Sequence, residues 1–213
     1  MAWNDKLKRI IPEGWELHSL SELGSFKNGI NYSKEEMGDK DYKIVNVRNI
    51  SSSSIFIDNS DLDVLTLKKS NGDNYLVTNS DILIARSGVP GATRLLQDNE
   101  DNVVYCGFII CFSVHDINDK QFLFFSLKQL ESVTKTQSNG SILSNISQEV
   151  LKQLYVVMPD PAVQDRFNEN ISSIFSLIQN RQREIEKLTK QRDELLPLLM
   201  NGQLNSDLSA YYL

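Results

Sequence analysis

The chain has 213 residues, of which 40% are hydrophobic and 23% are charged, and its mean hydropathy is -0.31. This balance is typical of a globular chain that folds in water, and no apolar run reaches the roughly 18 residues that a membrane span needs. The formal net charge is -6, from 22 Lys and Arg against 28 Asp and Glu. An acidic chain does not coat nucleic acid by bulk charge, so any nucleic-acid contact must use a local patch.

The first 158 residues predict a β-rich domain with packed helices. Short runs of β-formers between Gly, Asn, Ser and Asp clusters predict strands at residues 42–47, 75–77, 82–85 and 103–114. Ser19 and Glu22 have the spacing of a capping box and predict a short helix. A broad apolar face predicts a second helix over about 120–133 with Asp119 as its cap, and a third is expected within 147–154. The expected fold class is α+β, with a mixed or antiparallel sheet.

The two cysteines, Cys106 and Cys111, are five positions apart in the apolar stretch 103–114. Odd spacing places side chains on opposite faces of a strand, so we expect two buried thiols rather than a disulfide or a metal pair. The N-terminal residues have neither the apolar core nor the cleavage pattern of a secretory signal. We therefore expect a cytoplasmic protein that does not contact membranes.

A long helix is predicted after Val157, with Asp160 as its cap and Pro161 in its first position. From Pro161 to Met200 such a helix would extend about 60 Å, too far for a domain of this size to cover. Hydrophobic positions recur at intervals of three and four, with arginine in two of the places. This heptad stripe consists of Ile171, Ile174, Ile178, Arg181, Ile185, Leu188, Arg192, Leu195 and Leu199.

A sustained heptad favours pairing with another helix, and an ordinary amphipathic helix lying along its own domain is the alternative. The two arginines could fix the register by meeting Glu184, Glu186 or Glu194 of a facing helix. Pro197 should kink or end the helix near its last turn. The expected organisation is a domain over 1–158, a dimerisation helix over 159–202 and a loosely held tail over 203–213.

Signatures of catalysis are missing from the sequence. His18 and His115 lie outside any HExxH or Cys/His cluster, and no glycine-rich phosphate loop or dinucleotide fingerprint occurs. Asp41 and Lys43 form the single D-x-K triplet, which has no convincing acidic partner upstream. We therefore expect a protein without catalytic residues, metal or cofactor of its own.

Three segments have a composition suited to nucleic-acid binding. Arg86 and Arg94 flank a glycine turn, and two guanidiniums there could approach a phosphate or a guanine edge. Asn46 and Arg48 share one face of a strand predicted over 42–50. A loop of small hydrogen-bonding side chains spans 135–141. The DNA-binding candidates are Asn46, Arg48, Arg86, Ser87, Gly88, Arg94, Lys135, Thr136, Gln137, Ser138 and Asn139. The alternatives are a plain hairpin with surface arginines and a flexible connector.

Five segments in chain order carry a family resemblance. They are residues 11–16 with 20–24 (IPEGWE and LSELG), 42–50 (YKIVNVRNI), 81–88 (DILIARSG), 147–161 with Gln164, and 195–204 (LLPLLMNGQL). Together they resemble the target-recognition half of a type I restriction-modification specificity subunit. Ser80 stands where glycine is usual in the family, and Val163 and Asp165 lie at positions where the family varies. These differences affect only a turn and the start of a helix, so the resemblance holds.

This resemblance implies a non-catalytic DNA reader that docks methyltransferase subunits, which bind S-adenosylmethionine, and sometimes a restriction subunit that translocates DNA. Members of the family carry two recognition domains and two spacer helices, and this chain has one of each. It is therefore expected to pair with a copy of itself and to read a bipartite inverted repeat. A spacer of about 60 Å against a DNA turn of roughly 35 Å predicts half-sites one to two turns apart, less any overhang of the domains.

Other functions stay open at this stage. The chain could be a standalone coiled-coil DNA-binding protein or decoy regulator, or an interaction scaffold that does not contact DNA. An intrinsic nuclease is a more distant alternative, because no set of metal-binding carboxylates is visible. The sequence leaves open which bases are recognised and whether two such helices pair in parallel or antiparallel.

Overall fold

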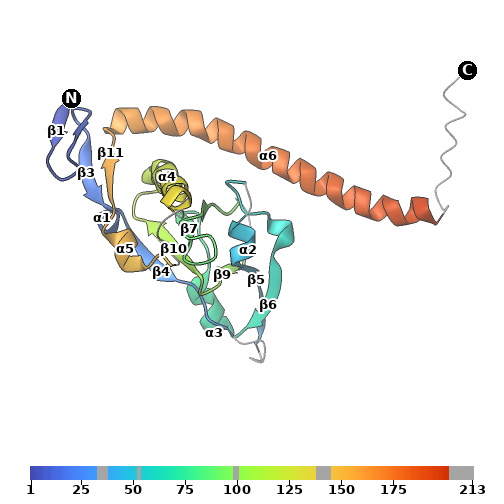
Figure 1. The fold of residues 1–213 in the computed structure, drawn as a ribbon. Coiled ribbons are helices and arrows are strands. Elements are labelled where there is room, and N and C mark those ends of the chain that lie inside the picture. The colour runs from blue at the N-terminus through green and yellow to red at the C-terminus, as the bar shows by residue number, and fades with distance from the viewer. Residues whose placement is uncertain (33–37, 52–53, 98–100, 138–144, 202–213) are drawn as a thin grey trace, which may run out of the picture. The chain divides into compact units, whose positions relative to one another are not determined.

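A computed structural model describes residues 1–32, 38–51, 54–97, 101–137 and 145–201 of the chain. Its contacts define two units, Met1–Ser172 and Ser173–Leu213. Every strand among the described residues belongs to the first unit, and the described part of the second unit belongs mainly to the long C-terminal helix (Figure 1). The expected α+β class with antiparallel pairing and a long final helix is confirmed.

The central sheet of the first unit is antiparallel and has the strand order β4-β10-β7-β8. Its strands are β4 (Gly24–Asn28), β7 (Asp81–Ala85), β8 (Thr93–Arg94) and β10 (Ile109–Val114). Helix α4 (Lys120–Gln137) contacts β7 and β8, and α2 (Val47–Ile50) contacts β7. All five residues of β7 are buried, as is usual for a strand covered on both faces.

A second sheet has the order β6-β5-β9, and its buried residues join those of the central sheet in one core. Strand β5 (Lys40–Val45) pairs antiparallel with β6 (Asp63–Leu67) and parallel with β9 (Val103–Tyr105). The short helix α3 (Lys69–Gly72) follows β6. The 3-10 turns of this unit are η1 (Asn59–Asp61), η2 (Asp73–Tyr75) and η3 (Ile117–Asp119).

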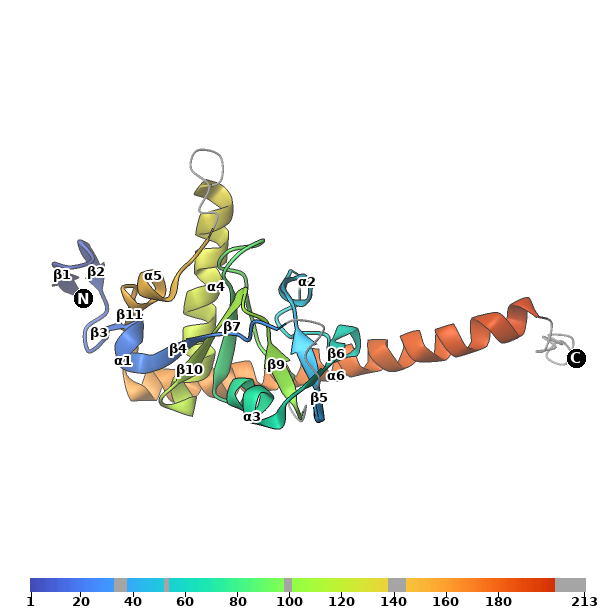
Figure 2. The same ribbon diagram turned by 90° about the horizontal axis from the view of Figure 1, so that it is seen from below.

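Two further strand pairs lie at one end of the first unit, beside α1 (Leu20–Leu23) and α5 (Gln148–Lys152), as Figure 1 and Figure 2 both show. Strand β1 (Ala2–Asn4) pairs with β2 (Arg9–Ile11), and β3 (Glu16–Ser19) pairs with β11 (Tyr155–Met158). The predicted capping box is confirmed, since Ser19 is the N-cap of α1 and Glu22 bonds back to it.

Two of the predicted strands differ from the observed ones. The strand expected over 103–114 is two strands, β9 and β10, separated by a turn at residues 106–108. Residues 75–77 form no strand, although the Val77 amide donates to the Val103 carbonyl. Asp119 directly precedes α4, and its carboxylate accepts a hydrogen bond from Gln164. Asp116 caps the turn η3 that leads into α4.

The two cysteines are buried and free, as expected. Cys106 lies in the turn between β9 and β10, and Cys111 lies within β10. Burial raises the pKa of both thiols, because the charged thiolate loses its water. They are therefore core side chains and poor nucleophiles.

The long helix α6 spans Pro161–Met200. The Asp160 side chain accepts a hydrogen bond from the Val163 amide at 3.1 Å, which confirms the predicted cap and the Pro161 start. The helix continues through Pro197 and ends at Met200, three residues later. Because Pro197 lies in the last turn, its missing N–H removes a single helical hydrogen bond.

A buried ion pair connects the central sheet to α4. The Arg94 guanidinium of β8 lies 3.0 Å from the Glu131 carboxylate, and the two side chains are 3% and 11% exposed. Arg94 also donates to the Thr93 carbonyl, and Lys128 lies 3.1 Å from the same Glu131 carboxylate. Both charges are paired, as burial requires.

We predict that Glu131→Ala lowers the free energy of unfolding by about 3–5 kcal/mol, because Arg94 would remain buried without its counter-ion. Chemical denaturation measures this loss. The control is Glu13→Ala, which breaks the exposed 3.5 Å pair with the Met1 amino group and should cost less than about 1 kcal/mol. Similar losses for the two variants would contradict the structural role of the buried pair.

Candidate nucleic-acid interface

Arg86 lies where three chain segments meet. It follows β7, its amide donates to the Phe108 carbonyl in the β9–β10 turn at 2.9 Å, and its carbonyl accepts from the Ile146 amide at 2.9 Å. Ile146 belongs to the segment that enters α5. These two backbone hydrogen bonds fix the position from which the Arg86 side chain projects.

The Arg86 side chain is half-buried, and within the described residues its guanidinium has neither a hydrogen bond nor an ion pair. The pKa of the nearby Glu149 carboxyl is lowered, chiefly by a hydrogen bond from Ser147 and to a smaller extent by the charge of Arg86. Arg86 therefore keeps its hydrogen-bond donors available for an external acceptor, close to the start of α5.

The loop after Arg86 needs its glycines. Gly88 and Gly91 have positive φ angles of 78° and 83°. A Cβ at Gly88 would lie 2.9 Å from the Val47 side chain of α2, so the loop packs against that helix. Ser87 is half-buried and Gly88 is exposed. The predicted turn is therefore present, and contact of Arg86, Ser87 and Gly88 with DNA stays a prediction.

Arg94 does not belong to this surface, and its prediction as a DNA contact is wrong. In the β7–β8 register it lies opposite Leu83, and its guanidinium forms the buried ion pair with Glu131. At 3% exposure the guanidinium cannot reach a phosphate or a base without unfolding of that contact. The turn thus presents one arginine to solvent instead of two.

Asn46 and Arg48 project together as predicted, but toward carboxylates. The strand ends at Val45, and Asn46 is the N-cap of α2. Arg48 lies 3.0 Å from Asp61 and 2.9 Å from Asp63, and Asn46 donates to Asp63 at 3.0 Å. The charge of Arg48 is therefore already neutralised, and a phosphate at this place would face two aspartates.

The third predicted segment is partly helical. Lys135, Thr136 and Gln137 form the end of α4 and are not part of a loop. Ser138 and Asn139 lie outside the described residues. The contribution of this segment to DNA binding stays a prediction.

Phe108 was not found by sequence reasoning, although it lies beside Arg86. Its side chain is 63% exposed at the β9–β10 turn. An aromatic residue directly after Gly107, between two buried strands, was the signal that could have revealed it. The prediction of a single strand over 103–114 left no turn at Phe108, so this residue was not considered as a candidate.

In the described ranges no cluster of three or more His, Cys, Asp or Glu side chains could hold a metal ion. Across the same residues, no helix combines the length and apolarity that crossing a bilayer requires.

The fold places the chain in a class of proteins in which a β-rich domain is followed directly by a long helix with an apolar stripe. Residues 12–192 match the model of the type I restriction modification DNA specificity domain, and the chain belongs to this family. It is 27% identical over 212 residues to the type I restriction enzyme MjaIX specificity subunit of Methanocaldococcus jannaschii, covering 95% of this chain and 47% of that subunit. It is 24% identical over 201 residues to the HindI specificity subunit of Haemophilus influenzae, covering 91% and 42%.

Solved structures show the same fold. The type I restriction-modification S subunit from M. genitalium superimposes with a TM-score of 0.59 at 19% identity, over 90% of this chain and 47% of the other. The HsdS subunit from Thermoanaerobacter tengcongensis gives 0.57 at 15% identity, over 84% and 44%. The chain thus spans about half the length of the curated relatives it matches.

Proposed function

We propose that the chain is a non-catalytic, sequence-reading subunit of a type I restriction-modification enzyme that binds double-stranded DNA. The observation that supports this proposal most directly is the environment of Arg86. Its backbone is fixed where three segments meet, and within the described residues its guanidinium N–H groups have no hydrogen-bond partner. Such a group can bind a guanine edge or a phosphate through two parallel hydrogen bonds. Membership of a DNA specificity family supports this choice of ligand.

The net charge of -6 supports the idea that other subunits contribute to DNA binding. Electrostatic attraction to the DNA backbone comes from Lys and Arg, and the Arg48 and Arg94 side chains already pair with carboxylates. We propose that methyltransferase subunits dock on this chain and supply further phosphate contacts. Those subunits would bind S-adenosylmethionine, and a restriction subunit could join the same assembly.

The apolar stripe of α6 supports self-pairing. Within the second unit, the exposed aliphatic side chains of the stripe are Ile174 at 51%, Ile185 at 63%, Leu188 at 56%, Leu195 at 47% and Leu199 at 50%, and Leu177, Leu196 and Leu198 are exposed beside it. A row of this kind is stable in water when a second helix covers it. We propose that the second helix belongs to another copy of the chain.

An antiparallel pair suits the charges of the stripe. In a parallel, in-register pair, Arg181 and Arg192 would each lie opposite their own copies. An antiparallel pair centred on Ile185 places Leu199 level with Ile171 and Arg192 level with Ile178, so neither arginine faces itself. Arg181 pairs with Glu184 of its own helix at 2.7 Å and Arg192 with Asp193 at 2.6 Å. Antiparallel helix dipoles add to this preference.

We predict that Arg86→Ala weakens binding of a labelled duplex by the complex with methyltransferase subunits about 5- to 150-fold, since a bidentate arginine contact is worth about 1–3 kcal/mol. Fluorescence anisotropy at fixed salt measures the affinity. Arg48→Ala is the control and should change it less than about 3-fold, because Asp61 and Asp63 already neutralise that charge. An equal loss for both variants would argue against a specific role for Arg86.

A charge within the stripe should separate the two copies. We predict that Ile185→Glu shifts the chain from dimer to monomer in sedimentation equilibrium, because two carboxylates would meet at the twofold axis. Lys187→Glu changes an exposed position outside the stripe and should leave the dimer intact. A wild-type chain that sediments as a monomer would refute the pairing itself.

The target sequence tests the whole arrangement. Two identical domains related by a twofold axis should read an inverted repeat with a non-specific gap of one to two turns, less the overhang of the domains. Methylated bases can be mapped in a host that expresses this chain with its methyltransferase subunit. A symmetric gapped motif is expected. An asymmetric motif would contradict the homodimer, and no methylation beyond the background would contradict the DNA-reading function.

A further inference from the structure

Phe108 is an exposed aromatic residue in the turn between β9 and β10, residues 106–108. Its side chain is 63% exposed, although Tyr105 before the turn and Ile109 after it are both buried. An aromatic ring in water gains free energy when it covers an apolar group of a ligand. The turn therefore offers one apolar contact on a well-packed base.

Backbone hydrogen bonds hold this turn in place. The Cys106 amide donates to the Val45 carbonyl at 3.0 Å, and the Ile109 amide donates to the Cys106 carbonyl at 2.9 Å. The carbonyl of Phe108 itself accepts from the Arg86 amide at 2.9 Å. Because the backbone is already fixed, little further ordering is needed when the ring meets a ligand.

The segment after β4 packs against the same turn. The amides of Gly29 and Ile30 donate to carbonyls on either side of the turn at 3.0 and 2.9 Å. A Cβ at Gly107 would collide with the side-chain oxygen of Asn31, so the turn backbone lies directly against this segment. Phe108 is thus presented by a turn with support from several parts of the sheet.

Arg86 and Phe108 are close enough to contact the same stretch of a ligand. Residues joined by a backbone hydrogen bond of this kind have Cα atoms about 5 Å apart. Successive base pairs of DNA are about 3.4 Å apart. When Arg86 binds a base edge or a phosphate, Phe108 therefore lies within one or two base pairs of that point.

The surroundings of Phe108 favour DNA over a protein partner. In the segments around the turn, 28–32, 45–51 and 85–97, no other large hydrophobic side chain among the described residues is exposed. A docking protein usually covers a contiguous apolar patch. A lone ring beside a cation suits a ligand with one small apolar group in polar, anionic surroundings. The thymine methyl group in the major groove is such a group.

We propose that Phe108 determines part of the sequence specificity by covering the C5 methyl group of a thymine. The proposal rests on the DNA-reading function proposed above and adds one recognised base to it. Phenylalanine is among the side chains that make this contact in the major groove. The ring has no group that could bond to the cytosine N4 amino group, so covering a cytosine would cost free energy.

Replacement of single thymines by uracil tests the proposal, because uracil lacks only the methyl group. The probe is a labelled duplex with the motif obtained by mapping methylated bases, bound to the full chain in complex with methyltransferase subunits. For the wild type, one thymine of a half-site should weaken binding about 4-fold when it is replaced, which is the effect of one buried methyl group. The Phe108→Ala complex should bind the two duplexes equally.

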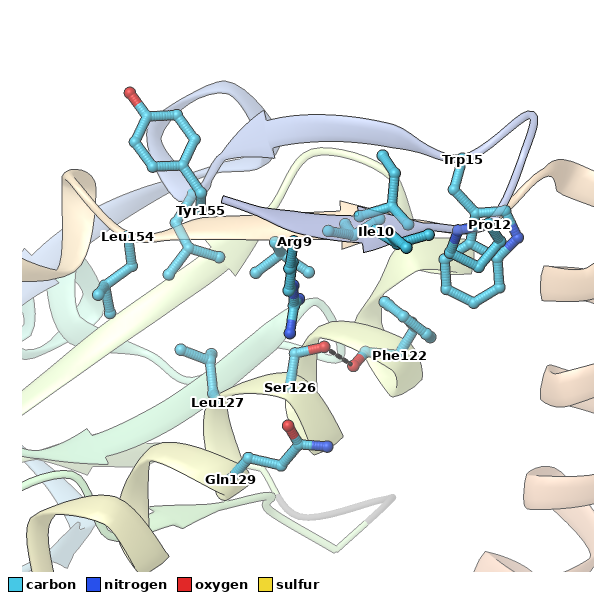
Figure 3. Close-up of a pocket in the computed structure, with 14 residues that line it drawn as sticks. Arg9, Ile10, Pro12, Trp15, Phe122, Ser126, Leu127, Gln129, Leu154 and Tyr155 are labelled. Atoms are coloured by element: carbon cyan, nitrogen blue, oxygen red, sulfur yellow. Dashed lines mark hydrogen bonds between the residues drawn. The ribbon is translucent and has the colours of Figure 1, made fainter. Parts of the chain in front are cut away.

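Two further variants serve as controls. Phe108→Leu keeps an apolar side chain and should keep the preference for thymine over uracil. Tyr155→Ala removes another exposed ring, which lines a cavity of about 500 Å³ between α4 and the N-terminal strands. Figure 3 shows Arg9 extending into this cavity. Arg86 and Phe108 do not line it, so Tyr155→Ala should leave the preference unchanged.

The outcomes separate this proposal from the function on which it rests. A wild-type complex that binds the duplex but ignores every uracil, or a preference that persists in Phe108→Ala, would overturn the thymine contact and leave DNA reading intact. A half-site without thymine has the same meaning. Loss of the methyltransferase subunits from the Phe108→Ala complex would assign the ring to a protein interface instead. A wild-type complex that does not bind the duplex would refute both proposals.

Discussion

The Arg94–Glu131 ion pair is the constraint on which both the candidate interface and the cavity beside α4 depend. It joins β8 to α4 where water is excluded, so that α4 cannot slide along the sheet without separating two buried charges. On one side, the fixed sheet positions the loop between β7 and β8 that carries Arg86. On the other, Phe122 and Ser126 of the same helix form a wall of the cavity that Arg9 enters. One interaction therefore positions both the loop that carries Arg86 and the α4 side of this cavity.

Local signals in the sequence predicted the elements that local chemistry forms. The Ser19 and Glu22 capping box, the Asp160 cap with Pro161 and the start of α4 at Lys120 all depend on neighbours within four residues. The end of β5 was missed for a related reason. Asn46 and Asn49 form a reciprocal cap that begins α2 inside a run of β-formers, and the β-propensity of that run concealed it.

The candidate site was predictable only in part, because charge pairing is not local. Arg86 could be found from an apolar strand that ends at a glycine loop. Arg94 is unavailable for DNA because it pairs with Glu131, which lies 37 residues later in the chain. Arg48 is likewise paired with Asp61 and Asp63. Register and burial select which of several arginines remains available, and neither quantity can be read from composition. The cavity likewise combines strands from the two ends of the first unit, β2 and β11.

The single glycine loop with its one available arginine has a consequence for how a target sequence changes over time. In the proposed dimer, each recognition residue is present twice and is encoded once. A substitution at Arg86 would therefore alter both half-sites together, and the new target would remain palindromic. Two recognition domains encoded separately could change one at a time, whereas the proposed dimer would change both half-sites in the same step.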